Sequence, residues 1–103
     1  MGRKFENSIY WSIRRKVRYI WYFSDGTYEC DFIFKLNEEF FAIQVCYDLN
    51  GDSQDREIKG LLSALRFFNL KYGVILTIDQ TDKIMTEGLK IEVIPAFTFL
   101  SYA

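Results

Sequence analysis

The segments YECDFIF (Tyr28–Phe34) and FFAIQVCYDL (Phe40–Leu49) decide the fold, because both are rich in the aromatic and branched residues that favour β-strands. With Asn37 and Glu38 as the turn between them, the apolar residues of the first strand fall opposite those of the second. The resulting pairs are Tyr28–Tyr47, Cys30–Val45, Phe32–Ile43 and Phe34–Phe41. A slip of one residue would mix the apolar and polar sets, so we expect this register.

The polar residues of the same two segments then gather on the opposite face of the sheet. They are Glu29, Asp31, Gln44 and Cys46, with Asp31 opposite Gln44 and Glu29 opposite Cys46. Cys30 and Cys46 fall on opposite faces in this register, which disfavours a disulfide between them. Polar groups inside such apolar strands indicate either a functional site or a hydrogen-bonded structural network.

The residues upstream predict a helix and one further strand. Apolar residues recur at helical spacing from Lys4 onward, which predicts a first helix. Arg18–Phe23 has strand composition, and Asp25-Gly26 predicts a two-residue hairpin that pairs it with Thr27–Lys35. In that pairing Tyr19, Trp21 and Phe23 extend the apolar face.

Downstream of the central segments, we expect an amphipathic helix that follows the polar stretch Asp48–Gln54 and ends near Asn69. The continuous apolar run Tyr72–Ile78 predicts a buried strand, and a helix between two strands indicates a parallel crossover. A closing hairpin around Glu87-Gly88 and a short helix over Ala96–Tyr102 complete the chain. We therefore expect a single α/β domain over residues 1–103, with a mixed sheet of about four to five strands flanked by helices.

Composition limits the chemistry that the chain can perform. The 103 residues carry a net charge of −1 and include two cysteines and no histidine, which excludes the usual zinc spacings and catalysis through a Cys–His or Ser–His–Asp group. The first eighteen residues are basic, so Arg14, Arg15 and Arg18 are candidate nucleic-acid contacts; the alternative is the solvated face of a helix. No apolar run reaches the ~18 residues of a membrane span and no signal-peptide pattern is present, so we expect a cytoplasmic protein with free thiols and no membrane partner.

The order of these elements resembles the PD-(D/E)XK, or restriction-endonuclease-like, superfamily. A helix bearing Glu6, a hairpin bearing Asp31 and a third strand bearing Gln44-Val45-Cys46 are followed by a helix and a strand. The segments KFENSIYWSIRRK, YECDFIF, AIQVCYDL, REIKGLLSAL and EGLKIEVIP also resemble, in order and spacing, the C-terminal domain that follows an AAA-type ATPase module in archaeal and bacterial proteins. The resemblance implies a restriction-endonuclease-like fold, DNA as a partner, and Mg²⁺ held by carboxylates beside a phosphodiester.

By that resemblance Asp31 matches the first metal-binding acid, and Glu6 matches the supporting acid of the helix. Gln44 stands at the position of the second acid, and Cys46 stands at the position of the lysine. A neutral amide attracts Mg²⁺ less than a carboxylate does, and a thiol with a pKa of ~8.5 is mostly uncharged at pH 7. The resemblance therefore implies that catalysis has lapsed.

Three residues are candidates to restore what is missing. Glu29 would complete a magnesium set with Asp31 and Gln44, because it shares their face of the sheet. Lys35 or Lys59 would supply the cation from another position.

We therefore expect a degenerate nuclease-like domain that acts as a nucleic-acid-binding or protein-interaction module associated with an AAA-type ATPase. One alternative is an active Mg²⁺-dependent DNA nuclease. The other is a structural dimerisation domain, whose homodimer contact would be the aromatic end formed by Phe97, Phe99 and Tyr102.

Overall fold

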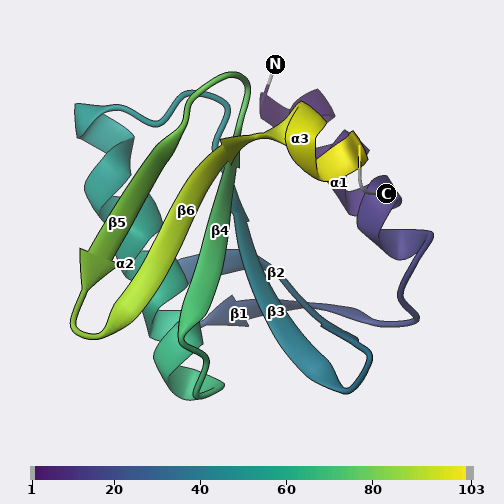
Figure 1. The fold of residues 1–103 in the computed structure, drawn as a ribbon, viewed down its shortest axis with the longest axis horizontal. Helices are drawn as coiled ribbons and strands as arrows, with labels where there is room; N and C mark the ends of the chain where they lie inside the picture. Colours follow the sequence, from purple (N-terminus) through teal and green to yellow (C-terminus); the bar gives the residue numbers. More distant parts are fainter. Residues whose placement is uncertain (1, 102–103) are drawn as a thin grey trace.

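A computed structural model describes residues 2–101 and contains, within them, three helices and six strands (Figure 1). In chain order they are α1 (Gly2–Arg14), β1 (Ile20–Ser24), β2 (Glu29–Leu36), β3 (Glu39–Val45), α2 (Gly51–Phe67), β4 (Tyr72–Thr77), β5 (Asp82–Thr86), β6 (Leu89–Pro95) and α3 (Ala96–Ser101). Tyr102, the end of the last predicted helix, lies outside the described residues.

The strands form one sheet in the order β1-β2-β3-β4-β6-β5. The β3–β4 and β4–β6 pairs are parallel, and the other pairs are antiparallel. The predicted α/β class, with a mixed sheet and a helical crossover, is confirmed. The expected count of four to five strands was too low, because both strands of the closing hairpin join the sheet, with β6 beside β4.

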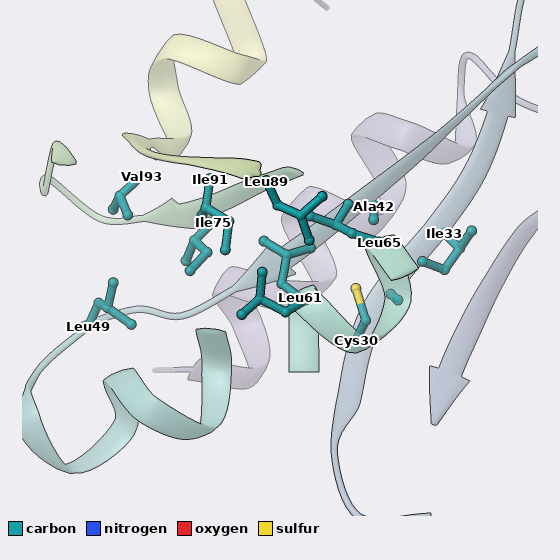
Figure 2. Packing of buried hydrophobic residues seen from close by; sticks show 12 residues of the cluster. Cys30, Ile33, Ala42, Leu49, Leu61, Leu65, Ile75, Leu89, Ile91 and Val93 are labelled. Atoms are coloured by element: carbon teal, nitrogen blue, oxygen red, sulfur yellow. The ribbon is translucent and has the colours of Figure 1, made fainter. Parts of the chain in front are cut away.

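The two faces of the sheet are covered by different helices. Buried residues of α2 pack on one face, where Leu61 and Leu65 point toward Ile75 and Leu89 in the cluster shown in Figure 2. Residues of α1, together with Ala96 of α3, pack on the other face. The sheet is therefore the middle layer of a three-layer domain, which is why its central strands are apolar on both faces.

The β2–β3 register is the one predicted, since Phe32 pairs with Ile43 and Phe34 pairs with Phe41. The pairing of β2 with β3 ends at Phe32–Ile43 and does not continue to Asp31. Beyond this point the side chains of β2 no longer alternate between the two faces of the sheet. Cys30 and Ile33 are three residues apart and yet belong to the same cluster under α2.

The β1–β2 register differs from the prediction in two ways. Ser24 pairs with Glu29, so the turn holds four residues instead of two. The Asp25 carboxylate stabilises this wider turn by accepting hydrogen bonds from the backbone N–H groups of Thr27 (2.8 Å) and Tyr28 (2.7 Å).

The second difference is a bulge between Trp21 and Phe23, which pairs Trp21 with Ile33. Phe23 packs against the cluster under α2, whereas Tyr19 and Trp21 are 59% and 45% exposed. The predicted apolar face across three strands is therefore wrong for β1.

The helix α2 begins inside the polar stretch Asp48–Gln54, which was predicted to precede it. Asn50 caps it by accepting hydrogen bonds from the N–H groups of Asp52 (2.9 Å) and Ser53 (3.2 Å). This earlier start adds about one turn to the predicted helix.

Candidate functional site

Asp31 and Gln44 occupy the point at which β2 separates from β3. The Gln44 Oε1 atom accepts a hydrogen bond from the Asp31 backbone N–H at 2.9 Å. The Asp31 Oδ2 atom accepts one from the Val45 N–H at 2.8 Å. Side chains thus supply the partners that backbone groups would provide in a continuous ladder.

The amide nitrogen of Gln44 also reaches two backbone carbonyls. Its Nε2 atom donates to Glu29 at 2.8 Å and to Glu57 at 3.0 Å. The side chain is 2% exposed and thereby joins β2, β3 and α2 through three hydrogen bonds. Both amide protons and one oxygen lone pair are committed to the fold.

Gly60 allows α2 to approach this corner closely. A Cβ atom at Gly60 would lie 2.0 Å from the Glu29 carbonyl oxygen and 2.7 Å from Gln44 Nε2. Neither neighbour can retreat without breaking the hydrogen bond between them. The absence of a side chain at this position is therefore a requirement of the Gln44 network.

Two carboxyl groups in the corner hold their protons more tightly than usual. Burial raises the pKa of Asp31 to about 6, with further contributions from the charges of Glu6 and Glu29, against the lowering effect of the Val45 hydrogen bond. Burial, followed by the charge of Asp31, raises the pKa of Glu57 to about 7. The corner is therefore acidic and poor in compensating cations.

Glu57 was not among the predicted site residues. It lies on the same helical face as Gly60, Leu61 and Ala64, which are three, four and seven residues further along α2. Because the predicted helix follows Gln54 and so includes Glu57, this spacing is the signal that could have indicated a carboxyl group facing the sheet. Its side chain is 17% exposed, and the Arg56 Nε atom lies 3.9 Å from its carboxylate.

The remaining predicted site residues lie around this corner in different environments. Glu6 is an exposed residue of α1, and Glu29 is an exposed residue at the start of β2. Cys46 is partly buried, packs against the cluster under α2 and has its Sγ atom 3.8 Å from the Ser53 Oγ. Burial raises the pKa of the Cys46 thiol, which makes it a neutral group at pH 7.

Cys30 and Cys46 lie on the same side of the sheet, so the prediction of opposite faces is wrong. The reason is the loss of alternation where β2 leaves β3. Both thiols are free. Burial raises the pKa of Cys30 to about 12.

These side chains do not form a magnesium cage as they are arranged here. Among residues 2–101, no group of three His, Cys, Asp or Glu side chains is placed to hold a metal ion. The Gln44 oxygen already accepts the Asp31 N–H, and one Asp31 oxygen accepts the Val45 N–H. The set of Glu29, Asp31 and Gln44 as magnesium ligands stays a prediction.

The two candidate lysines are engaged elsewhere. Lys35 Nζ lies 3.6 Å from Glu38 and above the ring of Phe40. Lys59 Nζ lies 3.0 Å from Asp55 and above the ring of Tyr28. Neither supplies a charge that lowers the pKa of Asp31.

The basic residues at the end of α1 lie on the surface. Arg14, Arg15 and Arg18 are all exposed. Arg14 also donates to the Val17 carbonyl at 2.9 Å and so helps to close the helix, while the Arg18 guanidinium lies 5.9 Å from the ring centre of Tyr19. Their role as nucleic-acid contacts stays a prediction.

The C-terminal aromatic residues are divided between surface and core. Phe97 is 66% exposed, whereas Phe99 packs against the cluster under α1. Phe99 also lines an apolar hollow of about 360 Å³ between the helices and the sheet.

None of the helices in the described part of the chain is long and apolar enough to cross a membrane.

Comparisons with known proteins give one relative. No family model and no solved structure match the chain. An uncharacterized protein of Methanocaldococcus jannaschii is 38% identical over 74 residues. The match covers 67% of this chain and 16% of that protein, so the chain is similar to a small part of a much longer polypeptide.

Proposed function

We propose that the chain is a restriction-endonuclease-like domain that has lost catalysis and binds nucleic acid, in association with an AAA-type ATPase module. The order α1-β1-β2-β3-α2-β4 supports this fold, with antiparallel pairing of the first three strands and a parallel β4 beside β3. The strands β5 and β6 extend that core on the far side of β4. The match to a short part of a longer archaeal protein supports a domain that occurs within a larger chain.

The hydrogen bonding of Gln44 is the observation that carries the loss of catalysis. Where the resemblance places a metal-binding acid, this chain has an amide that donates to two backbone carbonyls. A carboxylate has no protons to donate. It cannot replace this amide without leaving the Glu29 carbonyl unpaired and removing the second hydrogen bond of the Glu57 carbonyl, which lies within α2. The position has thus become part of the framework that holds α2 on the sheet.

Nucleic-acid binding is assigned to the exposed arginines at the end of α1. Arginine pairs with phosphate through several N–H donors, and such contacts weaken as salt rises, because binding releases counterions. The net charge of −1 leaves no general attraction for a polyanion, so binding has to be local. Arg15 and Arg18 carry the cleanest test, because Arg14 also stabilises the helix end.

The test is a binding titration of a labelled DNA oligonucleotide, followed by fluorescence anisotropy at two salt concentrations. The double variant Arg15→Gln/Arg18→Gln is expected to bind more weakly than the parent and to show a shallower salt dependence. The variant Lys71→Gln/Lys83→Gln removes two exposed charges elsewhere and serves as the control. Equal losses in both variants, or no binding by the parent chain, would contradict the proposal.

An active metal-dependent nuclease is the second candidate, and Glu57 favours it. This carboxyl lies near Asp31 and has a pKa raised to about 7 by burial and by the Asp31 charge. It would supply, from α2, an acid that is missing at position 44. Cleavage of plasmid DNA with Mg²⁺ or Mn²⁺, abolished by both Asp31→Asn and Glu57→Gln, would favour this candidate over the first.

A further inference from the structure

Trp21 of the edge strand β1 and Tyr19, just before that strand, form a stacked aromatic pair. Their ring centres are 5.9 Å apart, with 24° between the ring planes. Trp21 also contacts Phe40, with 6.2 Å between the ring centres, and this contact supports the indole. Because both rings remain about half exposed, the pair presents aromatic faces to solvent on a fixed support.

The pairing of β1 with β2 explains why these rings lie on this face. It pairs Trp21 with Ile33, so the indole lies on the side of the sheet that α2 covers. The helix ends at Phe67 and leaves the outer part of β1 and β2 open. Tyr19, two residues before Trp21, falls on the same side.

Two cations flank the aromatic pair. The guanidinium of Arg18 lies 5.9 Å from the centre of the Tyr19 ring. The ammonium of Lys35 lies 5.6 Å from the centre of the Phe40 ring, beside Trp21. A hollow of about 210 Å³ lies here, lined by the two cations, the two rings of the pair, and Asn37 and Glu38 of the β2–β3 turn.

The combination of stacked aromatic faces and flanking cations matches the chemistry of an unpaired nucleotide. Successive bases stack on aromatic side chains, while lysine and arginine contact the phosphates. Bases within a duplex are already stacked and present only their edges, so a duplex cannot use such faces. The Glu38 carboxylate lies 3.6 Å from Lys35 Nζ. Its negative charge repels a phosphate at this position and competes with it for the lysine.

We propose that Tyr19, Trp21, Arg18 and Lys35 form a binding site for single-stranded nucleic acid, in which bases stack on the two rings and phosphates contact the two cations. This inference rests on the proposed nucleic-acid binding and names its substrate form. The site lies on the edge strand, away from the Gln44 corner, and requires no metal.

Two kinds of substitution separate stacking from charge. Trp21→Ala and Tyr19→Ala each remove one stacking face and are expected to weaken binding of a 12-nucleotide pyrimidine DNA strand by about 5- to 150-fold, without changing the salt dependence. Lys35→Gln removes a phosphate contact and is expected to reduce the slope of log K against log salt by ~0.7. Glu38→Gln is expected to strengthen binding, because it frees Lys35 and removes a repelling charge.

The controls address folding and position. Trp21→Phe keeps an aromatic face and is expected to retain most of the affinity that Trp21→Ala loses. Met85→Ala shortens an exposed side chain on β5, the opposite edge of the sheet, and is expected to bind like the parent chain. In a Trp11→Phe background, quenching of the remaining indole by the oligonucleotide reports direct contact with Trp21.

The outcomes distinguish this inference from the function on which it rests. Binding of duplex DNA without binding of single strands overturns the site and leaves the general function standing. Single-strand binding that survives both Trp21→Ala and Tyr19→Ala also overturns the site alone. The absence of any nucleic-acid binding overturns both.

Discussion

The side-chain amide of Gln44 donates a hydrogen bond to the backbone carbonyl of Glu29, 2.8 Å away, at the point where β2 leaves β3. This contact replaces a backbone ladder with a side chain and places a polar residue at the centre of an apolar sheet. A buried amide with all its hydrogen bonds satisfied stabilises a fold, whereas one with missing partners is costly. The substitutions below follow from that asymmetry.

Gln44→Met is expected to destabilise the domain by about 3 kcal/mol, because it keeps the volume but leaves the Asp31 N–H and the Glu29 carbonyl without partners. The Glu57 carbonyl loses only the second of its hydrogen bonds, since it also accepts within α2. Gln44→Glu keeps the acceptor but loses both donors and adds a charge beside Asp31. Its destabilisation is expected to be larger at pH 8 than at pH 5, where the carboxyl can be protonated. Urea unfolding measures both effects, with exposed Gln54→Glu as the control. A Gln44→Glu protein as stable as the parent would contradict the structural role.

Gly60→Ala is expected to destabilise the protein by several kcal/mol, although alanine normally favours a helix interior by about 1 kcal/mol over glycine. The added Cβ would collide with the Glu29 carbonyl. Gly51→Ala is the matched control in the same helix, because no atom lies within 4 Å of a Cβ added there. Thermal unfolding should therefore show a lower Tm for Gly60→Ala and no lowering of Tm for Gly51→Ala. Equal behaviour of the two would show that α2 does not approach β2 as described.

Stability is expected to fall as pH rises from about 5 to about 8. Asp31 and Glu57 have folded-state pKa values raised to about 6 and about 7 by burial, so the stability they contribute is present below their ordinary values of 3.8 and 4.5 and is lost as pH rises through the raised ones. The loss should be on the order of 2 kcal/mol. Asp31→Asn and Glu57→Gln should each reduce the difference in unfolding free energy between pH 5 and pH 8, whereas exposed Glu39→Gln should not.

Asp25 acts in the opposite sense at lower pH. Hydrogen bonds from Ser63, Tyr28 and Thr27 lower the pKa of its carboxyl to about 2. The stability it contributes is present above its ordinary pKa of 3.8 and is lost as pH falls through about 2. The three carboxyl groups together therefore predict maximal stability near about pH 4, between the ordinary pKa values of Asp25 and Glu57. A maximum at pH 8 would contradict the raised pKa values of Asp31 and Glu57.

Thiol labelling should distinguish the two cysteines. Cys30 is fully buried and burial raises its pKa to about 12, so it should react with a disulfide reagent only after unfolding. Cys46 is partly exposed and should react slowly in the folded protein. Cys46→Ser should remove the slow phase and leave one thiol that labels only in denaturant. Rapid labelling of Cys30 in the native state would contradict its place in the core.

The sequence predicted the elements better than it predicted the details at their ends. The β2–β3 register followed from apolar alternation, which is a strong constraint where both faces are buried. The β1–β2 register did not follow, because a bulge and a four-residue turn depend on the Asp25 side chain and on packing that alternation does not describe. Glu57 was missed although the predicted helix contains it, because a single carboxyl group on a helix is usually solvated and only its spacing to Gly60, Leu61 and Ala64 places it toward the sheet.

The candidate site was found in part. Asp31 and Gln44 were placed together by the register alone, and the structure joins them by a hydrogen bond. What the sequence left open was the direction of the Gln44 amide, which decides between a ligand and a structural bridge. That direction depends on Gly60, since only a glycine lets α2 come within reach of the amide.

The central claim is that this domain binds nucleic acid and does not cut it. The most direct measurement is to incubate the purified domain with a labelled single-stranded oligonucleotide and Mg²⁺ or Mn²⁺, follow anisotropy, and then analyse the DNA on a denaturing gel. We expect a rise in anisotropy, with full-length DNA recovered. Cleavage that is lost in Asp31→Asn, or a complete absence of binding, would contradict it.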